Sequence, residues 1–119
     1  METAREKLAV AKELAKSGFG VVAVVFAYAS MFHSCRALLF KDGVQEKSHY
    51  CVIEYVKDKY CRGGKLDFGL ITIMDSFREE RQDVMYGLEK VQASGKEVKT
   101  AMENAEKLIL AVGKIVGGK

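Results

Sequence analysis

Histidine is the side chain most often used for proton transfer near neutral pH, and this chain contains two, His33 and His49. Each lies two positions before a cysteine, Cys35 and Cys51 respectively. Residues two apart on a helix point in different directions, so neither pair can form a cysteine–histidine nucleophile if these segments are helical. The sequence also contains no Gly-x-Ser-x-Gly motif, no phosphate-binding glycine loop and no cysteine pair at zinc-binding spacing.

A metal centre is not expected either. Glu46 and His49 match one half of the Glu-x-x-His pattern that builds di-iron sites in helical bundles. A complete site needs a second such pair and a glutamate from each of two further helices. The chain has one pair, and Glu46 is expected to lie in a loop. We therefore predict neither a metal nor another cofactor.

Several polar residues lie where the apolar pattern is strongest. They fall in two segments, with Tyr28, His33 and Arg36 in one and Arg81 and Tyr86 in the other. In a structural interpretation, the tyrosines make hydrogen bonds at the edge of the core and the arginines extend their charge to solvent. In a functional interpretation, an arginine binds phosphate and a tyrosine stacks on a base. Composition alone favours the structural interpretation.

Helices are expected to position these residues. The chain has 119 residues, 11 glycines and no proline, and 49% of its residues are apolar. This length indicates one domain over residues 1–119, and the apolar content excludes a disordered chain. The absence of proline and the spacing of the glycines suit long helices with clean stops. The net charge of +3 arises from interleaved charges, so no segment resembles a nucleic-acid-binding arm.

Five helical segments are predicted. The first begins at a capping box formed by Thr3 and Glu6 and stops at Ser17–Gly18. The second covers about residues 21–41, because its apolar stripes keep the helical period, although the valines at 21–25 alone are equally compatible with a strand. Its wide apolar surface indicates a central helix contacted from several sides.

The other three segments have clear starts and stops. The third begins with Ser48 as N-cap and ends at residues 62–64, the fourth follows Asp67 and breaks at Gly87, and the fifth begins at a Ser94–Glu97 capping box. No linker is long enough to divide the chain. The pattern predicts an all-α bundle of four or five helices.

Residues 19–32 carry no charge and form the one candidate for a membrane span. They fall short of the ~20 residues that a bilayer requires and continue directly into His33 and Arg36, so a buried core helix explains them better. The residues before them mix both charges, unlike a signal peptide. We expect a cytoplasmic protein without membrane association, whose three cysteines are reduced thiols: Cys35, Cys51 and Cys61.

Residues 26–40 read Phe-Ala-Tyr-Ala-Ser-Met-Phe-His-Ser-Cys-Arg-Ala-Leu-Leu-Phe. This run resembles the central helix of the HEPN domain family (higher eukaryotes and prokaryotes nucleotide-binding), in particular its small stand-alone bacterial and archaeal members. Further pieces carry the same resemblance in the same order: Lys47-Ser48-His49, Leu66-Asp67, Arg81 followed by Tyr86-Gly87, and the terminal helix 97–116. The resemblance covers nearly the whole chain.

This resemblance implies an up-and-down bundle of four or five helices and a homodimer packed along two of them. Many members of the family are ribonucleases. Others pair with a minimal nucleotidyltransferase, often as a toxin–antitoxin couple. The width of the apolar surface on the second segment directs us to the second or fourth segment as the dimer interface.

The ribonuclease members use an arginine followed, after four to six residues, by a histidine. The arginine stabilises charge on the phosphorane and the imidazole moves protons. No arginine of this chain has a histidine at that spacing. Five residues after Arg81 stands Tyr86, whose phenol is a poor base at neutral pH. The catalytic motif is therefore absent, and we lean against an enzyme.

Binding is the function that remains. Arg36, Arg81 and Tyr86 are candidates to line a cleft for phosphate and base, His49 lies at a helix start that favours anions, and Tyr28 shares the central helix. We predict a non-catalytic homodimer that binds nucleotide or RNA, or serves as the partner subunit of a nucleotidyltransferase. The alternatives are a ribonuclease with an altered site at Arg81 and Tyr86, and a purely structural dimerisation module.

Overall fold

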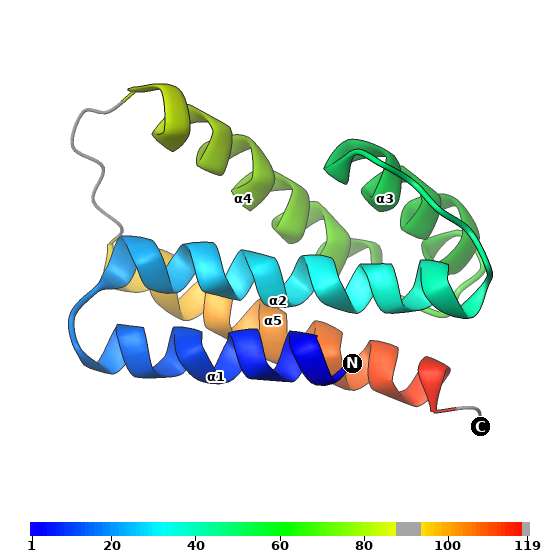
Figure 1. Ribbon diagram of the computed structural model, residues 1–119, viewed down its shortest axis with the longest axis horizontal. Coiled ribbons are helices and arrows are strands. Elements are labelled where there is room, and N and C mark those ends of the chain that lie inside the picture. The colour runs from blue at the N-terminus through cyan, green and yellow to red at the C-terminus, as the bar shows by residue number, and fades with distance from the viewer. Residues whose placement is uncertain (88–93, 118–119) are drawn as a thin grey trace.

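The computed structural model describes the backbone of residues 1–87 and 94–117 and the side chains of residues 1–79 and 94–117. The described elements are all helical (Figure 1): α1 Glu2–Lys16, α2 Gly20–Lys41, α3 His49–Val56 with the π-helical turn η1 Lys57–Cys61, α4 Phe68–Gly87 and α5 Gly95–Val116. The described ranges contain no strand. The predicted all-α bundle is confirmed.

The helix α2 lies at the centre of the bundle. It runs antiparallel to α1, and α5 lies against both, while α3 and α4 pack on the other side of α2 (Figure 1). Ten residues of α2 are buried, so its wide apolar surface is used in packing. Its length and composition alone would let Gly20–Lys41 cross a membrane, and 44% of its most apolar window is buried.

Buried polar side chains are satisfied inside the bundle. The Ser30 and Ser34 hydroxyls donate to carbonyl oxygens of their own helix, at Ala27 (2.7 Å) and Ser30 (3.0 Å). The Asn104 amide of α5 donates to the Leu70 carbonyl of α4 at 2.9 Å. Since an unpaired buried amide costs free energy, this bond favours one placement of α4 on α5.

Most predicted helix starts are confirmed. The Ser48 hydroxyl accepts from the Cys51 N–H at 3.0 Å, and Ser94 and Glu97 form both bonds of a capping box. Asp67 accepts from the Gly69 N–H at 2.8 Å.

The capping box at Thr3 and Glu6 is wrong. The helix α1 begins at Glu2, with Met1 as N-cap and no side-chain cap. The Arg5 N–H bonds to the Met1 carbonyl at 3.0 Å, so Thr3 already lies inside the first turn. The acidic Glu2 favours this earlier start through the positive N-terminal end of the helix dipole.

The third predicted segment is two elements in the structure. The α-helix ends at Val56 and continues as η1, whose wider turn is closed by the Arg62 N–H on the Lys57 carbonyl at 3.0 Å. The turn buries Tyr60 and Cys61. The Tyr60 hydroxyl then reaches Asp42 at the end of α2, at 2.8 Å, so the turn fastens α3 to α2.

Candidate functional site

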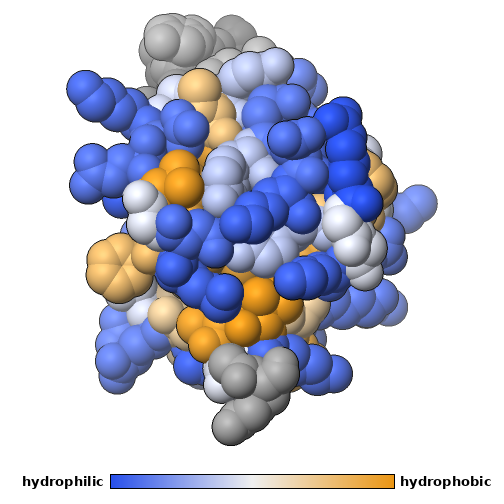
Figure 2. Space-filling model, turned by 90° about the vertical axis from the view of Figure 1, so that its right-hand side faces the viewer, coloured by the Kyte–Doolittle hydropathy of each residue, from blue (hydrophilic) through white to orange (hydrophobic). Residues whose placement is uncertain are grey.

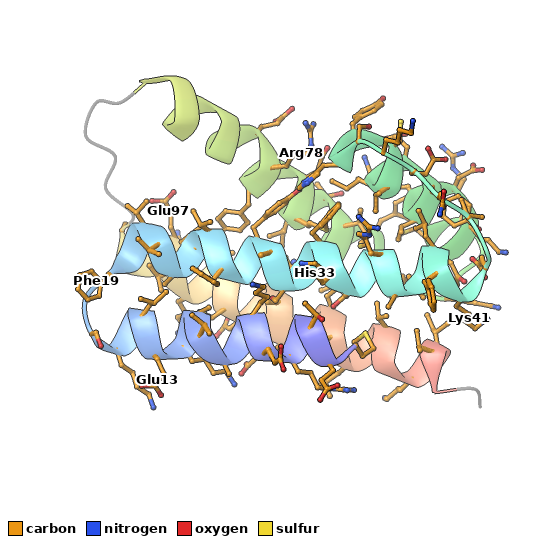
Figure 3. All side chains as sticks on the ribbon, viewed as in Figure 1. Glu13, Phe19, His33, Lys41, Arg78 and Glu97 are labelled. Atoms are coloured by element: carbon orange, nitrogen blue, oxygen red, sulfur yellow. The ribbon has the colours of Figure 1, made fainter. Side chains whose placement is uncertain are left out.

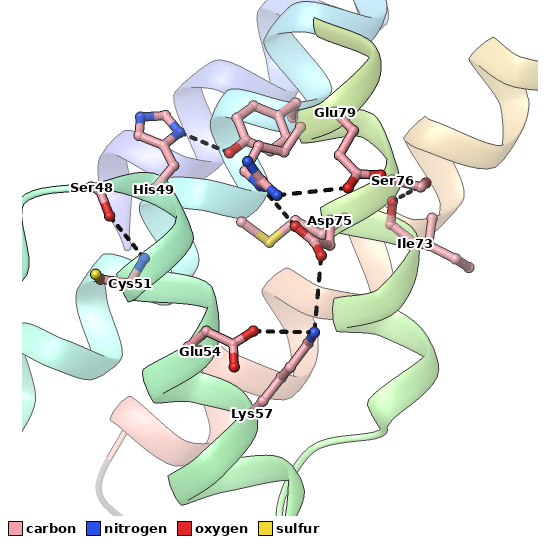
Figure 4. A network of polar contacts seen from close by, with 12 residues as sticks. Ser48, His49, Cys51, Glu54, Lys57, Ile73, Asp75, Ser76 and Glu79 are labelled. Atoms are coloured by element: carbon pink, nitrogen blue, oxygen red, sulfur yellow. Dashed lines mark hydrogen bonds and ion pairs between the residues drawn. The ribbon is translucent and has the colours of Figure 1, made fainter. Parts of the chain in front are cut away.

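Three of the five predicted ligand-binding residues come together around one phenylalanine. The Tyr28 hydroxyl and His49 Nδ1 lie 2.8 Å apart (Figure 4). The His49 ring stacks on Phe32 with 3.8 Å between ring centroids and a 10° interplanar angle, and Arg36 Cζ lies 5.9 Å from the Phe32 centroid. We call these four residues the Phe32 cluster.

The local sequence builds the Phe32 cluster from two elements. Tyr28, Phe32 and Arg36 are four residues apart, so they follow one another along the same face of α2. The Ser48 cap ends the linker 42–48 and makes His49 the first residue of α3. The Ser48 cap therefore fixes the position of His49 at the start of α3. The face of α2 that carries Phe32 provides the surface on which the imidazole stacks.

Burial divides the cluster into a rigid floor and a polar edge. Tyr28 is 1% exposed and Phe32 9%, and both belong to the hydrophobic core. His49 is half-buried and Arg36 is exposed. The guanidinium therefore meets solvent while the core holds the ring beneath it in place. A planar cation over an aromatic face is a favourable arrangement, worth about 0.5–1 kcal/mol at an exposed site.

The hydrogen bond between Tyr28 and His49 orients the imidazole. When the phenol donates to Nδ1, the neutral ring carries its own proton on Nε2. The bond also fixes the plane of the ring, which is what its stacking on Phe32 requires. The cluster can thus present a histidine of defined orientation beside an exposed arginine.

A second arginine, Arg78 of α4, lies near Tyr50, the residue that follows His49 in α3. Its Nε donates to Asp75 at 2.7 Å, and its Cζ lies 5.7 Å from the Tyr50 ring centroid. The hydrogen bond that Arg78 donates to Asp75 raises the pKa of Arg78. Lys57 of η1 also approaches Asp75, at 3.9 Å (Figure 4). Because Asp75 neutralises it, Arg78 is less suited than Arg36 to bind an anion.

The HEPN domain family model matches residues 1–115. The chain belongs to the HEPN domain family. The search of curated proteins finds no match to the chain. The family predicted from the central-helix motif is therefore confirmed, together with its helical bundle.

Two of the candidate residues of this HEPN chain are not placed by the structure. Arg81 and Tyr86 belong to the backbone of α4, but their side chains lie outside the described residues. The predictions that they bind a ligand, or form an altered ribonuclease site, stay predictions.

Sequence reasoning missed Phe32 and Arg78. Phe32 continues an apolar stripe and reads as an ordinary core residue. Arg78 has no histidine at the ribonuclease spacing, and the sequence assigns it no other role. Two sequence signals could have found them. Phe32 lies four residues after Tyr28 and four before Arg36, and Arg78 lies three residues after Asp75, so each set shares one face of a helix.

The cysteines of this HEPN domain differ in burial, and the most deeply buried one is not a nucleophile. Cys35 and Cys61 are buried, Cys51 is exposed, and all three are free. Burial raises the pKa of the Cys35 thiol to about 12, so it is not a thiolate nucleophile at neutral pH. Among the residues that the structure describes, no three His, Cys, Asp or Glu side chains gather as metal ligands, and Glu46 lies in the linker 42–48.

Proposed function

We propose that this HEPN protein binds nucleotides or RNA without cleaving them, at Arg36 beside the Phe32–His49 stack. One observation carries the proposal: the Arg36 guanidinium is exposed over an aromatic ring and forms no ion pair with any side chain in the described part of the chain. An arginine in this setting keeps its planar fork available for phosphate oxygens.

The surroundings of Arg36 support the same ligand chemistry. His49 is the first residue of α3, where the backbone N–H groups and the helix dipole favour an anion. The cluster therefore gathers a guanidinium, an imidazole and a helix start at one edge of α2. The absence of the family's arginine-to-histidine spacing supports binding rather than cleavage.

Isothermal titration with ATP and with a short oligouridylate tests the proposal. We expect Arg36→Ala to weaken binding about tenfold or more, which corresponds to about 1.4 kcal/mol. Arg62→Ala is the matched control, because Arg62 is exposed and already paired with Asp58 at 2.7 Å. Absence of binding, or equal binding by Arg36→Ala and the parent, overturns the proposal. Shortened oligouridylate after incubation overturns its non-catalytic part.

The proposal extends to a homodimer and to a nucleotidyltransferase partner. Membership of the HEPN family supports both, because members of this family usually form homodimers and some of them pair with such an enzyme. Co-purification from the native cell tests the partner. We expect a nucleotidyltransferase in the same fractions, and a chain that consistently elutes without one contradicts this part of the proposal.

A further inference from the structure

A separate groove lies at the end of the bundle where α2 terminates. Its volume is about 1060 Å³, and it is bordered by the first turn of α1, the C-terminal half of α2, the linker 42–48 and the end of α5. Figure 2 looks at this end of the molecule and shows apolar surface between charged side chains. Figure 3 places Lys41 here and His33 midway along α2. Only Arg36 is shared with the Phe32 cluster.

The floor of the groove is aliphatic. Its apolar lining includes Leu39 of α2, Val44 of the linker and Val116 of α5. Nucleic-acid bases are held by stacking on aromatic or guanidinium planes, which Leu39, Val44 and Val116 do not offer, although Phe40 and Arg36 line the same groove. Aliphatic side chains of a polypeptide match such a floor better, because burial of their surface is the favourable term. Phe40 stands beside the floor with 88% of its surface exposed.

The rim of the groove is cationic. Arg36, Lys41 and Lys47 line it, against one carboxylate, Glu46. Within the described residues, Lys47 and Arg36 have no ion-pair partner. Lys41 lies 4.0 Å from Asp42. That carboxylate is already occupied by two tyrosine hydroxyls and Lys59. The rim therefore carries positive charge that the described side chains do not neutralise.

We propose that this groove binds an acidic segment of a partner protein in which aliphatic residues alternate with carboxylates. The aliphatic side chains cover the partly exposed Val44 and Val116, and the carboxylates meet Lys41 and Lys47. Charge complementarity of this kind sets specificity and accelerates association. Phe40 serves as the central apolar contact, since exposed aromatic residues that become covered dominate interface energetics.

A labelled peptide of about eight residues, which spans about 26 Å when extended, serves as the probe for fluorescence anisotropy. Leucine and glutamate alternate in this peptide, and a control peptide has lysine in place of glutamate. We expect the acidic peptide alone to bind. Lys47→Glu and Lys41→Glu are each expected to weaken its binding at least about tenfold. Phe40→Ala is expected to weaken it to a similar extent.

Lys107→Glu is the matched control, because Lys107 is an exposed lysine of α5 outside the groove. It changes the net charge by the same amount and is expected to leave peptide binding unchanged. Circular dichroism establishes that each variant is folded. No binding of the acidic peptide to the parent overturns the proposal. So does equal binding by Lys47→Glu and Lys107→Glu.

Two further probes test whether the groove binds another class of ligand. The probes are an oligouridylate and vesicles that contain anionic lipid. If either binds the parent more tightly than it binds Lys47→Glu, while the acidic peptide binds neither protein, the groove is a nucleic-acid or lipid surface and the proposal is overturned. ATP binding at the Phe32 cluster is measured in the same variants. Because Lys41 and Lys47 are not part of that cluster, failure of the groove proposal leaves the nucleotide proposal standing.

Discussion

Asp42 is the most heavily engaged carboxylate among the described residues. Its Oδ2 accepts hydrogen bonds from the Tyr55 and Tyr60 hydroxyls, each at 2.8 Å, and lies 3.4 Å from Lys59 Nζ. Burial by itself would raise the pKa of this carboxyl. The hydrogen bonds from Tyr60 and Tyr55 and the charge of Lys59 outweigh burial, so the pKa of Asp42 is lowered.

This lowered pKa predicts a loss of stability in acid. The carboxyl of an unfolded chain has a pKa of about 3.9, so the native state binds the Asp42 proton less readily than the unfolded state does. The stabilisation is fully present above that pH and is lost as the pH falls through the lower, folded-state pKa. Asp42→Asn removes the charge at every pH.

We therefore expect Asp42→Asn to lower the free energy of unfolding by about 1–3 kcal/mol at neutral pH, and the difference from the parent to be smaller at an acidic pH below the unfolded-state pKa of about 3.9. Urea unfolding at the two pH values measures it. Asp58→Asn is the control, because Asp58 forms an exposed pair with Arg62 that is worth about 0–1 kcal/mol. Equal stability of Asp42→Asn and the parent at neutral pH contradicts the prediction.

Individual residues show where sequence reasoning works for the site. Tyr28, Arg36 and His49 could be predicted, because each is polar within an apolar stripe or directly follows a helix cap. Their meeting on Phe32 could not, because it depends on how the linker 42–48 returns α3 to α2. Arg78 was missed because an arginine three residues after an aspartate reads as a routine surface pair.

At the scale of the element, the capping box of α5 is the clearest local device. The Ser94 hydroxyl accepts from the Glu97 N–H at 3.1 Å, and the Glu97 carboxylate accepts from the Ser94 N–H at 3.0 Å. Both bonds satisfy N–H groups that have no partner inside the helix. The box therefore defines where the longest regular stripe of the sequence starts.

We expect Ser94→Ala to destabilise the protein by about 1 kcal/mol, which lowers the melting temperature by about 4 °C. Thermal melting followed by circular dichroism measures this. Ser17→Ala is the matched control, since Ser17 is an exposed residue after α1 and is joined to that helix by backbone bonds. If both variants melt at the same temperature as the parent, the box is not a source of stability.

Two elements depart from their sequence patterns for different reasons. The apolar pattern of α1 begins at Ala4, but hydrogen bonding extends the helix to Glu2, since periodicity reports burial and not helix ends. In the third segment the apolar period runs on through Tyr60, and nothing local distinguishes α3 from η1. The wider turn follows from tertiary packing, because it places the Tyr60 hydroxyl against Asp42 at the end of α2.

For the whole molecule, α2 determines both the fold and the placement of the two candidate sites. Its buried residues are enclosed by α1, α3, α4 and α5, and its polar edge carries Arg36, which belongs to both the Phe32 cluster and the end groove. The enclosure was predictable, because an apolar surface of that width needs several neighbours. The groove was not, since it requires residues from α1, the linker and α5 to meet.

Of the second and fourth segments, we expect α4 to form the dimer interface. Figure 1 shows α4 at the edge of the bundle, where it diverges from α2 toward its C-terminal end. In the described half of α4, one exposed face consists of Phe68, Thr72, Ser76 and Glu79, at helical spacing. Small hydroxyl residues beside an exposed phenylalanine allow close approach of a second copy, and a two-fold axis would pair this face with itself.

We expect the parent to sediment at twice the 13.2 kDa chain mass and Ser76→Arg to sediment at the chain mass. An arginine at this face places two like charges and two long side chains at the self-paired centre of the interface, which costs several kcal/mol. Lys107→Glu, on α5, is the control and should remain dimeric. A parent that is monomeric at micromolar concentration contradicts the expected dimer. A Ser76→Arg variant that stays dimeric contradicts the placement of the interface on this face of α4.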